Sequence, residues 1–164
     1  MKHGILYFFC GKMGAGKSTE AKSVAVESNA VLISEDEWLA VLYPEQIHTF
    51  DDYLQYSARI KPLVHAHVAN ILRAGASVVM DFPANTISQR KWFRELAEFA
   101  GATSKLKYLK VSDELCLTQI AKRRVEQPQR AAFDTESVFN AVSKYFQEPD
   151  ESEGIKFEVV QRDG

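Results

Sequence analysis

Residues 11–18 read GKMGAGKS, which completes the pattern G-x-x-x-x-G-K-[ST], and the apolar run 4–10 (GILYFFC) stands directly before it. Glycine has no Cβ, so a glycine-rich backbone can curl closely around an anion with its N–H groups pointing inward. The lysine of this pattern reaches the β- and γ-phosphates of a nucleotide, and the hydroxyl that follows it binds Mg²⁺. The pattern therefore predicts a binding site for a nucleoside triphosphate and Mg²⁺.

The segments on both sides of this loop agree with that prediction. A strand precedes it, and a helix is expected over residues 18–28, with its free N–H groups and positive dipole end facing the phosphates. Lys17 supplies the cation, Ser18 binds the metal, and Thr19 on the first helical turn is placed to touch the α-phosphate. The predicted nucleotide-binding residues are Gly11, Met13, Gly14, Ala15, Gly16, Lys17, Ser18 and Thr19.

Size and composition indicate one globular domain over residues 1–164, because 18.5 kDa with 46% hydrophobic residues is enough for a real core. The net charge of −2 provides no general attraction to nucleic acid or to an anionic membrane, although a local basic groove stays possible. Cys10 and Cys116 lack the spacing of a disulfide framework or zinc site, which fits a reducing cytoplasm. No stretch approaches the roughly 20 apolar residues of a membrane span.

Strand-like runs alternate with helical patterns along the chain, and this alternation predicts a parallel sheet with helices on both faces. The expected strands cover residues 4–10, 30–34, 77–81, 105–111 and 155–161.

Three further helices are expected. They cover residues 53–73, 87–100 and 113–125. Pro62 lies inside the first of them and predicts a break, or a new first turn, near Lys61. Thr86 begins a capping-box pattern before the second.

Acidic residues follow the second expected strand. Ligands of an open parallel sheet bind at the carboxyl ends of its strands. Asp36 lies nineteen positions after Lys17 and is placed to act as a general base that accepts the proton of an attacking hydroxyl. The alternative is that Ser34 caps the next helix and the acids simply favour its first turn. Glu35 and Glu37 are expected to be solvated.

The third expected strand ends in Asp81 after three apolar residues, which matches the Walker-B pattern of a carboxylate that holds Mg²⁺ through water. Strands also end in aspartate because that residue favours turns. We expect the metal role, so Ser18 and Asp81 are the predicted metal ligands. Asn85 follows closely and is expected either to reach the phosphate acceptor or to help cap the next helix.

Basic residues gather near the end of the helix expected at 113–125. A cationic lid over residues 126–134 could close on the triphosphate, neutralise charge on the transferred phosphoryl group and exclude water. Basic residues at a helix end also simply complement its dipole. The candidates for phosphate contact are Arg123, Arg124 and Arg130.

An aromatic-rich stretch lies between the second and third expected strands, where an acceptor pocket would form. Its members are Trp38, Tyr43, Phe50, Tyr53 and Tyr56. Core packing is the alternative explanation for them. Arg59 and Arg90 are expected either to contact an anion or to lie solvated on a helix face.

These residues together make the chain resemble the small P-loop kinases related to polynucleotide 5′-hydroxyl kinase, zeta toxin and chloramphenicol phosphotransferase. It most resembles the short single-domain AAA-type ATP-binding proteins described as predicted kinases. The resemblance covers nearly the whole chain. Residues 11–19, Asp36, Asp81, the arginine-containing lid and the ending FQEPDE at 146–151 carry it.

The resemblance implies that Asp36 is the general base. It also shows one departure. Polynucleotide kinases carry an arginine three residues after that aspartate, where it grips the substrate's phosphate, and this chain has Leu39 there. An uncharged small molecule is therefore favoured as acceptor over a nucleotide or polynucleotide.

The expected fold is an α/β P-loop NTPase with three αβα layers and five parallel strands in the order 2-3-1-4-5. The expected activity is transfer of the γ-phosphoryl group of ATP, with Mg²⁺, to a hydroxyl of a small-molecule acceptor. ATP is expected rather than GTP because no N-K-x-D motif occurs. Two alternatives stay open: an ATP-dependent switch that engages a protein partner, and a toxin-like kinase of nucleotide sugars.

Overall fold

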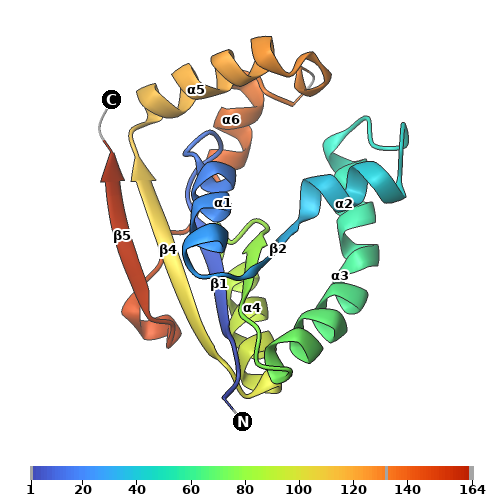
Figure 1. Cartoon of the computed structure of the whole chain (residues 1–164). Coiled ribbons are helices and arrows are strands. Elements are labelled where there is room, and N and C mark those ends of the chain that lie inside the picture. The colour runs from blue at the N-terminus through green and yellow to red at the C-terminus, as the bar shows by residue number, and fades with distance from the viewer. Residues whose placement is uncertain (1, 132, 163–164) are drawn as a thin grey trace.

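The computed structural model describes residues 2–131 and 133–162, and within them one sheet of five parallel strands forms the centre of the molecule (Figure 1). The strands are β1 (Ile5–Cys10), β2 (Val31–Ser34), β3 (Val78–Asp81), β4 (Thr103–Val111) and β5 (Phe157–Arg162). Their order across the sheet is β2-β3-β1-β4-β5, which confirms the predicted order. Every expected strand is present, with its ends shifted by at most two residues.

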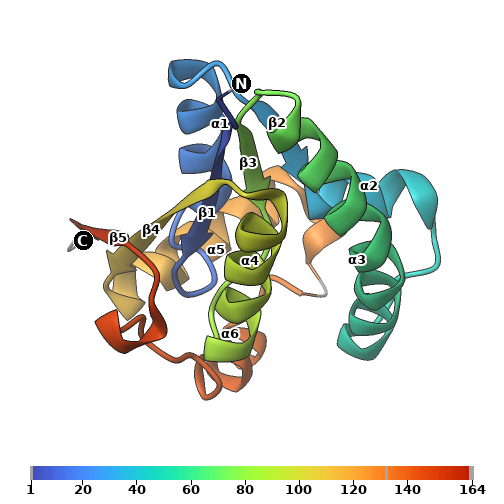
Figure 2. The same ribbon diagram turned by 90° about the horizontal axis from the view of Figure 1, so that it is seen from below.

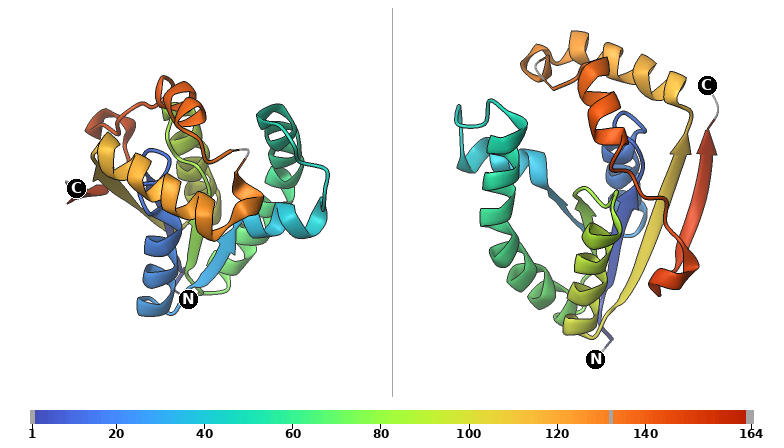
Figure 3. Two further views of the ribbon diagram at one scale, coloured as in Figure 1. Left: turned by 90° about the horizontal axis from the view of Figure 1, so that it is seen from above. Right: turned by 180° about the vertical axis from the view of Figure 1, so that it is seen from behind.

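Six α-helices and two 3₁₀ turns surround this sheet in the described part of the chain. They are α1 (Lys17–Glu27), α2 (Glu35–Leu42), α3 (Phe50–Arg73), α4 (Ile87–Ala100), α5 (Asp113–Glu126), η1 (Pro128–Arg130), α6 (Glu136–Ser143) and η2 (Glu151–Glu153). Viewed from below, α1 and α4 lie on opposite sides of the sheet (Figure 2). Helix α5 runs across the carboxyl ends of the strands (Figure 3).

Alternation along β1 explains the three layers, because successive strand residues point to opposite faces. Phe8 and Cys10 are buried in the cluster formed with α3 and α4, whereas Phe9 packs against α1. A third cluster, built around Leu109 and Phe139, joins β4 to α5 and α6. The predicted αβα arrangement is confirmed.

The break predicted at Pro62 is wrong, because α3 is continuous from Phe50 to Arg73. A proline inside a helix costs about 3 kcal/mol. Full burial of a large aliphatic side chain contributes about 1.5–3 kcal/mol each, and one face of α3 buries four of them. These are Ile60, Val64, Val68 and Leu72. Packing against the sheet therefore outweighs the local defect.

Helix α3 also begins earlier than expected, because Thr49 and Asp52 form a reciprocal cap. The Asp52 N–H donates to Thr49 Oγ1 at 3.1 Å, and the Thr49 N–H donates to Asp52 Oδ2 at 3.2 Å. Helix α6 was not expected; Thr135 caps it by accepting a hydrogen bond from the Val138 N–H at 3.1 Å. Within the described ranges, no helix is long and apolar enough to cross a membrane.

Candidate active site

The phosphate loop lies between β1 and α1, where the sequence pattern predicts it. Gly14 and Gly16 have φ values of +81° and +96°, a left-handed conformation that favours glycine. A Cβ at Gly14 would lie 2.6 Å from the carbonyl oxygen of Cys116, so only glycine lets α5 pack this closely. A Cβ at Gly11 would lie 2.9 Å from the Leu109 carbonyl oxygen.

A cleft of about 1820 Å³ opens above this loop at the carboxyl ends of the strands. The predicted nucleotide-binding residues that line it are Met13, Gly14, Ala15, Gly16, Lys17, Ser18 and Thr19. Gly11, the first residue of the loop, is outside this lining, and its N–H donates to Asn85 Oδ1 at 2.9 Å. Seven of the eight predicted nucleotide-binding residues thus line one cleft.

Lys17 is half-buried, and its ammonium donates hydrogen bonds to the carbonyl oxygens of Gly11 and, at 3.2 Å, Lys12. Burial lowers the pKa of Lys17 from 10.5 to about 8. The ammonium is held by neutral carbonyls and lacks an ion-pair partner among the described residues. An anion placed in the loop would supply that partner and stabilise the charged form of Lys17.

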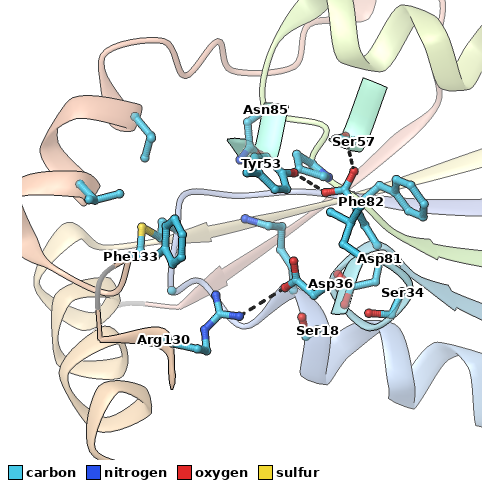
Figure 4. Close-up of a pocket in the computed structure, with 18 of the residues that line it drawn as sticks. Ser18, Ser34, Asp36, Tyr53, Ser57, Asp81, Phe82, Asn85, Arg130 and Phe133 are labelled. Atoms are coloured by element: carbon cyan, nitrogen blue, oxygen red, sulfur yellow. Dashed lines mark hydrogen bonds and ion pairs between the residues drawn. The ribbon is translucent and has the colours of Figure 1, made fainter. Parts of the chain in front are cut away.

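Ser18 and Asp81 meet at one edge of the cleft, because Ser18 lies in the first turn of α1 and Asp81 ends β3. Burial raises the pKa of the Asp81 carboxyl, and a hydrogen bond from the Ser18 hydroxyl acts in the opposite direction. Figure 4 shows Ser18, Asp36 and Asp81 on the same side of the cleft. Hydroxyl and carboxylate oxygens of this kind suit Mg²⁺, which usually takes one or two protein oxygens and completes its shell with water and phosphate.

Asp36 lies in the first turn of α2, and Ser34 caps that helix by accepting a hydrogen bond from the Glu37 N–H at 3.3 Å. The cap therefore comes from Ser34, and the Asp36 side chain remains available to the cleft, where 62% of it is exposed. Its Oδ2 lies 3.4 Å from Nη1 of Arg130 (Figure 4). A helix cap and a general base are therefore compatible in this turn, because Ser34 provides the cap and Asp36 stays open to the cleft.

Asp134 organises the predicted lid from a fully buried position. Its carboxylate accepts two hydrogen bonds from Arg123, at 2.7 and 2.8 Å, and one from Arg130 Nε at 3.0 Å. Arg123 and Arg130 both line the cleft, whereas Arg124 is exposed and lines a small hollow between α5 and α6. Two of the three candidate arginines are thus brought to the site.

The predicted lid segment 126–134 contains the short helical turn η1, where the sequence indicates a plain loop. Residue 132 lies outside the described part of the chain. Asp134 was missed as a functional candidate because an isolated aspartate beyond a glutamine- and proline-rich stretch has no distinctive pattern.

Asn85 connects the phosphate loop to the segment that follows α6. Its side-chain oxygen accepts from Gly11, its N–H donates to Gln89 Oε1 at 2.7 Å, and its carbonyl accepts from the Gln147 N–H at 2.9 Å. The side chain is thus committed to the loop. The expectations for Asn85 were contact with the phosphate acceptor or capping of the next helix, and neither includes this hydrogen bond with Gly11.

Glu35 is buried, so the expectation that it is solvated is wrong. Its carboxylate accepts hydrogen bonds from the Tyr53 hydroxyl and, at 2.7 Å, from Ser57 Oγ (Figure 4). Burial raises the pKa of the Glu35 carboxyl, and these hydrogen bonds lower it in part. Tyr53 and Ser57 lie one helical turn apart on α3. The sequence shows this spacing but does not indicate that Glu35 is their common partner.

Arg90 is fully buried, so the expectation that it is solvated is wrong. The anion that it contacts is a carboxylate of this chain, because Arg90 Nε lies 2.8 Å from Glu153 Oε1. Arg90 also donates to the Ala84 carbonyl oxygen at 3.0 Å. A sequence signal existed, since Arg90 shares the apolar face of α4 with Phe93 and Ala97 at helical spacing.

A family model described as an AAA domain matches residues 6–149. The chain belongs to this family. The match to the AAA-domain model includes the phosphate loop, Asp36, Asp81 and the lid arginines, whereas β5 lies beyond it. A comparison with curated proteins finds no match.

Three solved structures share the fold of the AAA-domain chain. A provisionally assigned kinase from Chloroflexus aurantiacus j-10-fl has a TM-score of 0.75 and 19% identity, over 98% of this chain and 86% of that chain. A sugar kinase from Janibacter sp. HTCC2649 has a TM-score of 0.63 and 18% identity, over 96% and 85%. The Mycobacterium tuberculosis APS kinase CysC, in complex with AMPPNP and APS, has a TM-score of 0.62 and 15% identity, over 98% and 90%. At these identities, the likeness shows a shared fold.

Proposed function

We propose that this chain is an ATP-dependent kinase that transfers the γ-phosphoryl group of ATP to a hydroxyl of a small molecule. The observation that carries the proposal is the position of Asp36. Its exposed carboxylate shares one cleft with Lys17 of the phosphate loop and faces a lid arginine at 3.4 Å. Transfer to a hydroxyl needs a base near the γ-phosphate that accepts the hydroxyl proton, and an exposed carboxylate in this cleft can serve as that base.

The proposed reaction is a direct displacement at the γ-phosphorus. The acceptor oxygen bonds to that phosphorus, the bond to the β–γ bridging oxygen breaks, and ADP leaves. Asp36 takes the proton of the acceptor hydroxyl. Mg²⁺, when bound at Ser18 and Asp81, neutralises phosphate charge.

Lys17 and the lid arginines contribute fixed positive charge around the transferred group. Arg123 and Arg130 are the lid residues we assign to this function, because Asp134 holds both at the cleft. Arg124 lines the outer hollow and is left out of the mechanism. The similar structures support a small-molecule acceptor, since two of the proteins are described as a sugar kinase and an APS kinase.

The test is a comparison of Asp36→Asn with Glu37→Gln, which removes the same charge from an exposed side chain in the same helical turn. Both proteins are incubated with γ-labelled ATP, Mg²⁺ and a set of hydroxylated metabolites. We expect Asp36→Asn to keep ATP affinity and lose about 10²–10⁴-fold in acceptor phosphorylation. Full acceptor phosphorylation by Asp36→Asn would show that Asp36 is not the general base. ATP-dependent capture of a protein partner without any phosphorylated product would favour the switch alternative.

A further inference from the structure

The Glu35 carboxylate is 2% exposed, lines the cleft and has two hydroxyl groups as partners. Among the described residues, no lysine or arginine comes within ion-pair distance of it. A buried carboxylate without a cation in direct contact is costly, and its hydroxyl donors and the more distant charge of Lys61 replace only part of its lost hydration. Each carboxylate oxygen can accept a further hydrogen bond beyond the one it already has. The site therefore has unused capacity for a positively charged group.

The part of the cleft formed by α2 and α3, where we place the acceptor, has few positive charges that could bind a negatively charged molecule. In the described residues of α2 and α3, Lys61 is the single basic side chain that lines the cleft. Its ammonium lies over the Trp92 ring, 5.8 Å from the centroid. Leu39, at the position where polynucleotide kinases carry a phosphate-gripping arginine, is 3% exposed and belongs to the core.

Aromatic rings form much of the same wall. Those that line it near α2 and α3 are Tyr43, Phe50, Tyr53, Phe82 and Trp92. Ring faces attract ammonium groups and also cover the carbon skeleton of a bound molecule. Together, the carboxylate and the rings favour a cationic organic group over a neutral or anionic one.

Glu35 and Asp36 are consecutive residues, so their Cα atoms are about 3.8 Å apart and their side chains leave α2 roughly 100° apart. Glu35 points to Tyr53 and Ser57, while Asp36 points toward Arg130 (Figure 4). One small molecule can therefore contact both carboxylates through two different groups a few bonds apart.

We propose that the phosphate acceptor is a hydroxyl-bearing amine, whose ammonium group binds Glu35 while its hydroxyl faces Asp36. This inference rests on the proposed kinase function and adds the chemical class of its substrate. The ammonium completes the pairing of Glu35, and a charge-assisted hydrogen bond of this kind is about twice as strong as a neutral one. An anionic acceptor would meet repulsion from both carboxylates.

The test uses three open-chain polyols that differ only at one end: glucamine with an ammonium, sorbitol with a hydroxyl and gluconate with a carboxylate. Binding of each to the full chain is measured by calorimetry at pH 7 in the presence of Mg²⁺ and a non-hydrolysable ATP analogue. We expect glucamine to bind about 10-fold more tightly than sorbitol, and gluconate to bind most weakly.

Two variants locate the effect. Glu35→Gln keeps the shape of the side chain and should abolish the preference for glucamine over sorbitol. Glu37→Gln removes an equal charge from the same turn and should change the preference by less than about 2-fold. If Glu35→Gln does not fold, Tyr53→Phe serves instead: it removes one donor from the carboxylate and should preserve or increase the preference.

Equal binding of the three polyols, strongest binding of gluconate, or no binding of glucamine would overturn the inference. An equal loss of the preference for glucamine in Glu35→Gln and Glu37→Gln would also overturn it, because the preference would then come from the overall negative charge of α2. ADP formation from ATP, with and without glucamine, is recorded for wild type and Asp36→Asn. If the three polyols bind equally while another hydroxyl compound is phosphorylated in an Asp36-dependent way, only the proposal of an amine acceptor is overturned. If no hydroxyl compound is phosphorylated in that way, the proposed kinase function is overturned.

Discussion

Nη1 of Arg130 lies 3.4 Å from Oδ2 of Asp36, so a lid arginine contacts the carboxylate that follows β2 across 94 residues of sequence. Both side chains are partly exposed, with 29% and 62% of their surface accessible, so the pair is weak and can separate readily. A bound triphosphate carries far more negative charge than one aspartate. We therefore expect Arg130 to turn toward the phosphates, which leaves Asp36 free for the acceptor.

Substitution of the three lid arginines should give unequal losses. Arg130→Ala and Arg123→Ala should each lower acceptor phosphorylation by about 10²-fold, because each removes a positively charged side chain that would stabilise the phosphoryl group during transfer. Arg124→Ala should stay close to wild type, because Arg124 lines the outer hollow. Steady-state kinetics of the three variants measures this. Equal losses in all three variants would show that only the overall positive charge of α5 and η1 matters.

Binding of metal-free ATP should take up protons at alkaline pH. Burial places the pKa of Lys17 at about 8, so roughly three quarters of Lys17 is neutral at pH 8.5 in the free protein. A triphosphate stabilises the charged form and raises this pKa, so binding should take up about 0.7 proton at pH 8.5 and almost none below pH 7. ATP affinity should fall accordingly as the pH rises through 8.

Calorimetry in two buffers that differ in ionisation enthalpy, with a chelator present, reports this proton uptake. Lys17→Arg is the control, because arginine stays charged throughout and should show no uptake. Identical binding enthalpies in both buffers at pH 8.5 would contradict the prediction.

Loss of the Asp134 charge should loosen the lid. Asp134→Asn leaves Arg123 and Arg130 without their shared carboxylate, and we expect the free energy of unfolding to fall by about 1–3 kcal/mol. Hydrogen exchange of α5 and η1 should accelerate, and turnover should fall with it. Asp113→Asn is the matched control, because its partner Lys12 and Asp113 itself are both partly exposed, so the change should stay below about 1 kcal/mol. A similar effect of both substitutions would argue against a special function for Asp134.

Asp81→Asn should separate metal binding from nucleotide binding. Its carboxylate is proposed to hold Mg²⁺, so the Mg²⁺ concentration needed for half-maximal ATP binding should rise by about 10-fold or more. Metal-free ATP should bind equally well or better, because a negative charge near the phosphates is gone. Since burial raises the pKa of Asp81, Mg²⁺ affinity of the wild type should decline as the pH falls through that raised value. Superimposable Mg²⁺ titrations would leave Asp81 as a strand-end residue only.

Local sequence determined the phosphate loop and the strands, whereas the order of the strands was expected from the resemblance to P-loop kinases. The loop conformation depends on its own glycines, and β1 and α1 are its immediate neighbours, so GKMGAGKS contains nearly all of the required information. Capping residues such as Thr86 likewise defined the limits of α4, because a cap acts within one helical turn.

Tertiary structure decided the burial of Glu35, the salt bridge of Arg90 with Glu153, and the gathering of the lid arginines around Asp134. The partners of Glu35 lie 18 and 22 residues away on α3, and Glu153 lies 63 residues from Arg90. Whether a charged side chain is solvated or buried depends on which helix packs over it, and a local sequence pattern does not encode that. The same packing carried α3 through Pro62, because four buried side chains outweigh one local helix defect.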